Sequence, residues 1–118
     1  MQAITYESFF DGLLTAVPEY RACYDDDLRF YGELLPHVFL GAFVQFLDDA
    51  LSAATGPDLL DRALTYLERA IQSDDLRVVN LVAVSFVENL PGNIHFGDIV
   101  QRMPRHLRAE VRQQRLEP

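Results

Sequence analysis

Apolar side chains recur at helical spacing in the segment that follows Pro36. Residues three and four positions apart lie on one face of an α-helix, so such a stripe predicts a helix with one buried side. The sequence predicts this helix over residues 36–54 and a second over 58–72, separated by the breaker TGPD at 55–58. The two stripes consist of Val38, Phe39, Ala42, Phe43, Phe46, Leu47, Ala50 and Leu51, then Leu59, Leu60, Ala63, Leu64, Leu67 and Ile71.

Two further segments show helical patterns of different character. Thr5 is positioned to cap a first helix whose apolar residues run to Val17, and Pro18 ends it. Residues 76–90, LRVVNLVAVSFVENL, are apolar on nearly every side. Their length and lack of alternation predict a buried central helix, although the β-branched residues leave a strand as the alternative.

Polar residues in so apolar a segment need partners or solvent, because an unpaired buried charge is costly. Ser85 and Glu88 are the two that raise this question. Glu88 is expected to face solvent near the end of the helix or to pair with an arginine such as Arg77 or Arg62. The functional alternative is that Glu88 contacts a partner protein.

The end of the chain completes an all-α pattern. PGN at 91–93 breaks the central helix, Asn93 is placed to cap a helix carrying Ile94, and Pro104 opens a last, arginine-rich helix. No linker divides the chain, so the sequence predicts one compact domain over 1–118 with six to seven helices, whose pairs could stack as HEAT-like units. The expected core joins Phe39, Phe43, Phe46, Leu64, Leu67, Val82 and Phe86.

The expected location of the protein and the redox state of its cysteine follow from features that the sequence lacks. No apolar run reaches the roughly 18 residues that a membrane helix needs, and the N-terminus lacks the features of a secretion signal. The single cysteine, Cys23, cannot form an intramolecular disulfide and is expected to be a small buried hydrophobic residue. These features predict a cytoplasmic protein with no membrane partner.

The charge is unevenly distributed along the chain. Eighteen acidic residues oppose ten basic ones, and every basic residue is an arginine. Residues 1–59 carry ten acids and two arginines, whereas residues 60–118 carry eight of each, so the net charge of −8 belongs to the first half. Direct nucleic-acid binding is disfavoured, because phosphate contacts require a basic surface.

The stretch CYDDDLRFYGELLPHVFLG at 23–41 raises the question of a metal or catalytic site. Pro36 should begin a helix and leave Glu33 outside it, so Glu33 and His37 do not share a helical face. His37 and Asp48 are eleven residues apart, about 16 Å along a helix, which is too far for one metal ion. Three neighbouring aspartates disfavour a Cys23 thiolate. We therefore expect no metal, no cofactor and no enzymatic activity.

The acidic residues are better interpreted as a surface that binds a basic protein, with a merely solvated face as the alternative. This predicted surface comprises Asp25, Asp26, Asp27, Glu33, His37, Asp48 and Asp49.

YGELLPHVFLG at 31–41 and VVNLVAVSFVENL at 78–90 resemble segments of a family of small helical bacterial proteins found beside polymorphic toxins. The resemblance covers roughly residues 6–110 and rests mostly on apolar positions together with Pro36, His37, Ser85 and Glu88. It implies an immunity protein that neutralises a cognate toxin by binding it. Two other classes remain open, an acidic helical adaptor and a DNA mimic that occupies a nucleic-acid-binding protein.

Overall fold

The computed structural model describes residues 3–54 and 56–117, and every regular element within them is helical. The all-α prediction is therefore confirmed, and the strand alternative for residues 76–90 is wrong. Thr55, part of the predicted break, lies outside the described residues. The elements are α1 (Phe9–Ala16), η1 (Pro18–Tyr20), α2 (Arg21–Tyr31), α3 (Pro36–Ala50), α4 (Gly56–Ala70), α5 (Leu76–Leu81), η2 (Val82–Phe86), η3 (Val87–Asn89), α6 (Phe96–Arg102) and α7 (Arg105–Gln113).

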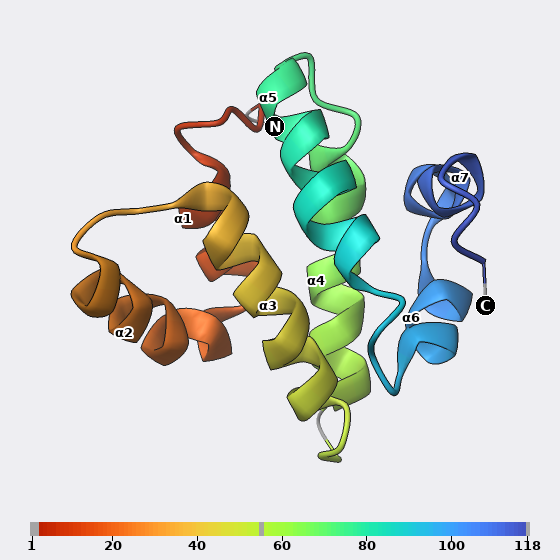
Figure 1. Cartoon of the computed structure of the whole chain (residues 1–118), viewed down its shortest axis with the longest axis horizontal. Helices are drawn as coiled ribbons and strands as arrows, with labels where there is room; N and C mark the ends of the chain where they lie inside the picture. The colour runs from red at the N-terminus through yellow and green to blue at the C-terminus, as the bar shows by residue number, and fades with distance from the viewer. Residues whose placement is uncertain (1–2, 55, 118) are drawn as a thin grey trace.

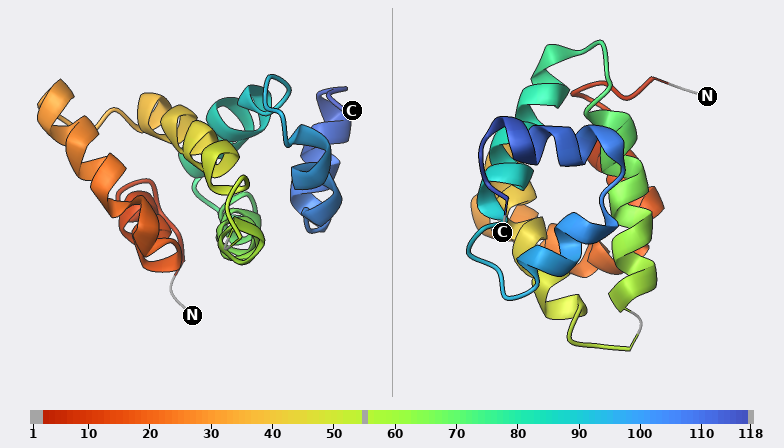
Figure 2. Two further views of the ribbon diagram at one scale, coloured as in Figure 1. Left: turned by 90° about the horizontal axis from the view of Figure 1, so that it is seen from below. Right: turned by 90° about the vertical axis from the view of Figure 1, so that its right-hand side faces the viewer.

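Three long helical segments form the middle of the molecule. α3 and the continuous segment α5–η2–η3 run in the same direction, and α4 runs antiparallel to both behind them (Figure 1). α1 packs against α4 on one side, and α6 and α7 close the opposite end (Figure 2). α2 lies at one end of the long axis and α7 near the other, so the acidic and arginine-rich helices are far apart (Figure 1).

The core forms where the apolar stripes of these helices meet. Phe39, Phe43 and Phe86 are completely buried, as are the leucines and valines that surround them. Six of the seven predicted core residues are buried, and Phe46 is only partly buried against the cluster. Phe39 and Phe43 belong to the stripe that begins at Pro36, so the helical period of the sequence directly determines this part of the core.

The central segment changes its helical form midway. Asp75 caps α5 by accepting the N–H of Arg77 at 3.0 Å, and the α-helix then passes into a π-helical turn at 82–86. The π turn places Ser85 in a buried position. Glu88 is exposed, consistent with the expectation that it faces solvent, while Arg77 and Arg62 pair with other carboxylates.

Polar contacts connect α3 with the segment that follows α5. His37 Nδ1 lies 2.5 Å from Ser85 Oγ, and near the other end of α3 Asp48 accepts the N–H of His95 at 3.3 Å. Between them, a side chain at Gly41 would meet the amide of Asn89, which shows how closely the two segments approach. The face of α3 that carries His37, Gly41 and Asp48 is therefore the one in contact with this neighbour.

Three helix starts differ from the predictions. α4 begins at Gly56, inside the predicted break, and not at residue 58, whereas the other two helices begin later than expected. α1 begins at Phe9 rather than after Thr5, because Thr5 and Ser8 hydrogen-bond to each other in a separate turn. α6 begins at Phe96, and Ile94, expected on its buried face, is 89% exposed in the preceding loop. Local hydrogen bonds and turns thus shorten both helices.

Gly12 allows α1 and α4 to approach. The Tyr66 hydroxyl donates to the carbonyl of Phe9 at 2.6 Å, and a Cβ at Gly12 would come within 2.4 Å of that hydroxyl. Because the Tyr66 ring is buried and stiff, we expect Gly12→Ala to lower the free energy of unfolding by about 1–3 kcal/mol. Urea unfolding followed by circular dichroism measures this.

Gly97→Ala is the matched control for that experiment. It also lies in a helix, and nothing stands within 4 Å of the added Cβ. We expect it to be neutral or to stabilise by up to about 1 kcal/mol. Equal free energies of unfolding for the two variants would show that the Tyr66 side chain moves aside without loss of stability.

Candidate functional site

The predicted acidic residues of α2 point in different directions. Asp25, Asp26 and Asp27 are consecutive, so each is rotated by about 100° from the one before. Asp25 lies 3.9 Å from Arg21, and Asp26 pairs with Arg29, both on the exposed side of the helix. Among the described residues, no ion pair involves Asp27 or Glu33. The end of α2 and the turn after it therefore carry negative charge without local neutralisation.

Exposed apolar side chains gather at the same place. We call Phe30, Tyr31, Leu34 and Val38 the apolar cluster; their exposed fractions are 80%, 42%, 39% and 45%. The rings of Phe30 and Tyr31 meet edge to face with centroids 4.9 Å apart. These four residues span only nine positions, over the end of α2, the turn and the start of α3. The acidic residues 25–27 and 33 and the apolar cluster thus belong to one stretch of the chain, residues 25–38.

α2 is held to the body by aromatic rings along one line. Tyr24 is the only buried residue of the helix, and its ring stacks on Phe10 at 5.7 Å. Tyr20, just before the helix, donates its hydroxyl to the carbonyl of Phe39 at 3.0 Å. Burial raises the pKa of both phenols. Leu28 also packs partly against the core, and the opposite side of α2 is exposed.

The turn after α2 is set by a glycine. Gly32 has a φ of +76°, the left-handed conformation that ends many helices, and its N–H bonds to the carbonyl of Leu28 at 2.9 Å. α3 then begins at Pro36, as predicted, with Glu33 outside it. This turn connects the exposed Phe30 at the end of α2 to Leu34 and to Val38 in the first turn of α3.

The seven residues of the predicted surface are not all brought together. Asp48 faces the loop before α6, where it accepts the N–H of His95, and Asp49 is exposed and bonded to Gln45 at 3.0 Å. They follow His37 by eleven and twelve residues, about 16–18 Å along the axis of α3. His37 contacts Ser85 of η2 and not a residue of α2. The structure therefore separates His37, Asp48 and Asp49 from Asp25, Asp26 and Asp27 on α2, and Glu33 lies in the turn between α2 and α3.

Three predictions about burial in this part of the chain are wrong, and one is Ala42, which was assigned to the buried stripe of α3 and is exposed. Cys23 is exposed rather than buried, because α2 contacts the body along the line of Tyr24 and residue 23 lies beside that line. Val38 was assigned to the buried stripe and is exposed, because it lies at the edge of the α3 face that Phe39 and Phe43 bury.

His37 and Ser85 approach closely enough to raise the question of a nucleophile and a base. Ser85 is only 4% exposed, and neither residue lines a hollow that the structure describes. Within residues 3–54 and 56–117, no carboxylate forms an ion pair with His37 that would orient its ring. A triad requires such an orienting group and access for a substrate. The pair is therefore best understood as a contact between α3 and η2.

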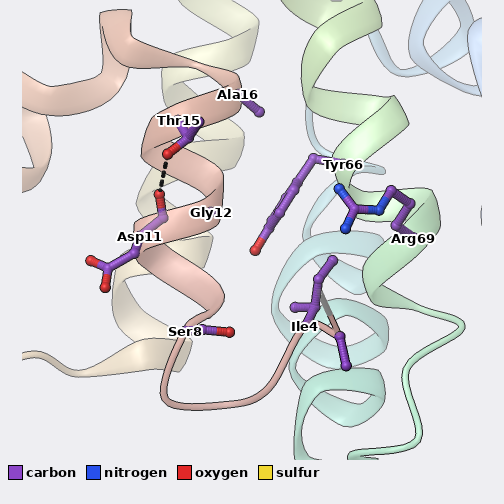
Figure 3. A pocket seen from close by; sticks show the side chains of 9 residues that line it. Ile4, Ser8, Asp11, Gly12, Thr15, Ala16, Tyr66 and Arg69 are labelled. Carbon is purple, nitrogen blue, oxygen red and sulfur yellow. Dashed lines mark hydrogen bonds between the residues drawn. The ribbon is translucent and has the colours of Figure 1, made fainter. Parts of the chain in front are cut away.

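A second surface feature is a groove between α1 and α4, made of two adjoining hollows of about 570 and 460 Å³. Tyr66 and Arg69 extend into it from α4, while the carboxylate of Asp11 points away (Figure 3). The hydroxyls of Tyr66, Thr15 and Thr65 donate to backbone carbonyls at 2.6–2.9 Å. Since these donors are already used, the groove offers fewer groups to a polar ligand than its size suggests.

Neither a metal-binding cluster nor a membrane-spanning helix is present in the described part of the chain. No group of three or more histidine, cysteine or carboxylate side chains is placed to hold a metal ion. No helix there has the length and apolar character needed to cross a membrane.

Sequence reasoning missed the apolar cluster. A signal was present, because Tyr24, Leu28 and Tyr31 follow the i, i+4, i+7 spacing of one helical face and Phe30 does not. A phenylalanine off the buried line of a short, charged helix is a candidate exposed residue.

Fold and surface together define a compact all-α domain with an acidic end that exposes aromatic and aliphatic side chains. Residues 10–117 match the family described as a domain of unknown function, DUF7674, and the chain belongs to that family. Comparison with curated proteins and with solved structures gives no match.

Proposed function

We propose that this chain is a non-enzymatic protein-binding domain that neutralises a cognate toxin with a basic surface, in the manner of a bacterial immunity protein in the cytoplasm. The observation that carries the proposal is the end of α2 and the turn after it. There Asp27 and Glu33, which form no ion pair within the described residues, flank the exposed rings of Phe30 and Tyr31 in the sequence. Aromatic residues are enriched at protein interfaces, and charged residues at their rims. The resemblance of residues 31–41 and 78–90 to segments of immunity proteins indicates that the partner is a toxin.

The electrostatic part of this proposal concerns how fast the partner binds. Exposed carboxylates attract a basic protein over a distance and raise its association rate more than they slow dissociation. The acidic end and the arginine-rich end lie at opposite ends of the molecule, so the field orients a basic partner towards α2 (Figure 1).

A DNA mimic is less well supported than a toxin-binding protein. Mimicry of a duplex requires carboxylates in rows that reproduce the spacing of phosphates. Here Asp25, Asp26 and Asp27 fan around one helix, and two of them lie beside arginines. An adaptor would use the same surface as an immunity protein, and only the identity of the partner separates these two roles.

Reversal of the three aspartates tests the proposed function. The partner to use is the protein encoded by the adjacent open reading frame, and the variant is Asp25→Lys, Asp26→Lys, Asp27→Lys. We expect the association rate to fall about tenfold at low salt, and the difference to shrink at high salt because exposed charges are screened. Surface plasmon resonance at two salt concentrations measures both rates.

A variant with the same change in net charge provides the control. Asp74, Asp98 and Glu117 are exposed and lie outside α2 and its turn. Their joint replacement by lysine should slow association much less than reversal at 25–27. Equal rates for wild type and the α2 variant at both salt concentrations would contradict the proposed surface.

A further inference from the structure

We infer that the basic partner surface contains an apolar pocket that receives Phe30, with the apolar cluster as the centre of the interface and the carboxylates as its rim. This inference rests on the proposed function and adds the chemistry of the partner. It predicts that dissociation and association depend on different residues of the same surface.

The distribution of exposed apolar side chains supports this inference. Among residues 3–54 and 56–117, seven large hydrophobic side chains are notably exposed, and four of them form the apolar cluster. The other three, Leu76, Val84 and Ile94, belong to separate parts of the chain. Single exposed apolar residues are ordinary on soluble proteins, whereas a local group of them marks an interaction site.

The two rings of the cluster are connected to the core before any partner binds. The Phe30 ring contacts Tyr31 at 4.9 Å, and the Tyr31 ring contacts the fully buried Phe39 at 6.0 Å. Gly32 fixes the turn that follows. Side chains that already have their bound position lose little conformational entropy on binding, so such residues contribute strongly to affinity.

The charge around the apolar cluster indicates which kind of partner binds there. Asp27 and Glu33 each lie three positions from Phe30 in the sequence and form no ion pair within the described residues. Anionic membrane surfaces repel such groups. A second copy of the chain carries a net charge of −8 and is repelled overall. A protein with lysines or arginines around an apolar pocket satisfies both the charge and the exposed rings.

The test is the single variant Phe30→Ala, measured against the protein encoded by the adjacent open reading frame. We expect the dissociation rate to rise at least tenfold and the association rate to change less than twofold, at both 50 and 500 mM NaCl. Ile94→Ala is the matched control, because Ile94 is 89% exposed and lies outside the cluster. It should leave both rates unchanged, and both variants should melt at the wild-type temperature.

The possible outcomes separate this inference from the function on which it rests. If the α2 charge reversal slows association but Phe30→Ala leaves dissociation unchanged, the pocket is absent and the proposed function stands. If wild-type protein does not bind the neighbouring gene product, the proposed function itself is overturned, and with it the pocket. Concentration-dependent sedimentation of wild type that Phe30→Ala abolishes would assign the cluster to a second copy and overturn the inference.

Discussion

Phe43→Ala should lower the free energy of unfolding by about 3–5 kcal/mol, the range measured when a buried aromatic ring is removed from a packed core. Phe43 has no exposed surface. Its ring meets Tyr20 edge to face at 4.9 Å and stacks near Phe46 at 5.9 Å. The substitution leaves a cavity beside Tyr20, which would also lose part of the contact that positions the start of α2. Urea unfolding followed by far-UV circular dichroism measures the change.

Phe30→Ala is the control for this prediction as well. The substitution removes the same atoms from a side chain that is 80% exposed, so the unfolding free energy should change by less than about 0.5 kcal/mol. Losses of similar size at positions 43 and 30 would mean that α2 packs differently from the arrangement described. A small loss at Phe43 would mean that the core collapses around the missing ring.

The helices that could be predicted from the sequence are those whose pattern is local. α3 begins at Pro36 because proline fixes the first turn and disfavours a helical residue before it. α4 carries a stripe at i, i+3, i+4, i+7, and its Arg62 bonds to Asp58 at 3.0 Å as the i,i+4 spacing indicates. Such features depend only on residues within one or two turns.

The features that could not be predicted depend on which elements become neighbours. An apolar stripe predicts which face of a helix is buried, but it does not predict how much of that face the neighbouring helices cover. Val38 lies at the edge of its stripe and was therefore wrongly predicted to be buried. Cys23 was misassigned for the same reason, because α2 has little of its surface covered. The contact between His37 and Ser85 joins residues 48 positions apart and depends on a π turn that no local pattern indicated.

The candidate site was therefore only half predicted. Net charge is additive along a chain, so the acidic character of residues 25–33 could be read directly from the sequence. Exposure is not additive, and the apolar cluster became visible only once α2 was seen to project from the body with Tyr24 as its single buried residue. The separation of Asp48 from the other acids likewise followed from the packing of α3 against its neighbour.

The second large effect is expected at Glu68, which joins α4 to the start of α7. Its two carboxylate oxygens accept the N–H of His106 at 3.0 Å and that of Leu107 at 2.9 Å, and His106 Nδ1 lies 2.7 Å away. The side chain is 15% exposed. The first N–H groups of a helix have no partner within it, and a carboxylate there is favoured by the helix dipole. Glu68 thus supplies the cap that α7 lacks in its own sequence.

Glu68→Ala should lower the free energy of unfolding by about 2–4 kcal/mol, because hydrogen bonds to charged groups are each worth about 1.5–3 kcal/mol and partial exposure lets water replace some of them. Glu68→Gln keeps an acceptor and should lose less. Faster hydrogen exchange confined to residues 105–113 in Glu68→Ala would locate the damage. If both variants unfold like wild type, α7 is held by Leu107 and Val111 alone.

The same contact makes a prediction about pH. Burial acts to raise the pKa of Glu68, but the N–H groups of His106 and Leu107 and the His106 ring outweigh it, so the pKa lies below the ordinary 4.5. A carboxyl with a lowered pKa in the folded state stabilises the protein above its unfolded value and loses that contribution as the pH falls. The difference in unfolding free energy between wild type and Glu68→Gln should therefore be full at pH 7 and shrink below about pH 4.5. A difference that is constant from pH 7 to pH 3 would show that the negative charge of Glu68 does not contribute, and that its shape alone holds α7.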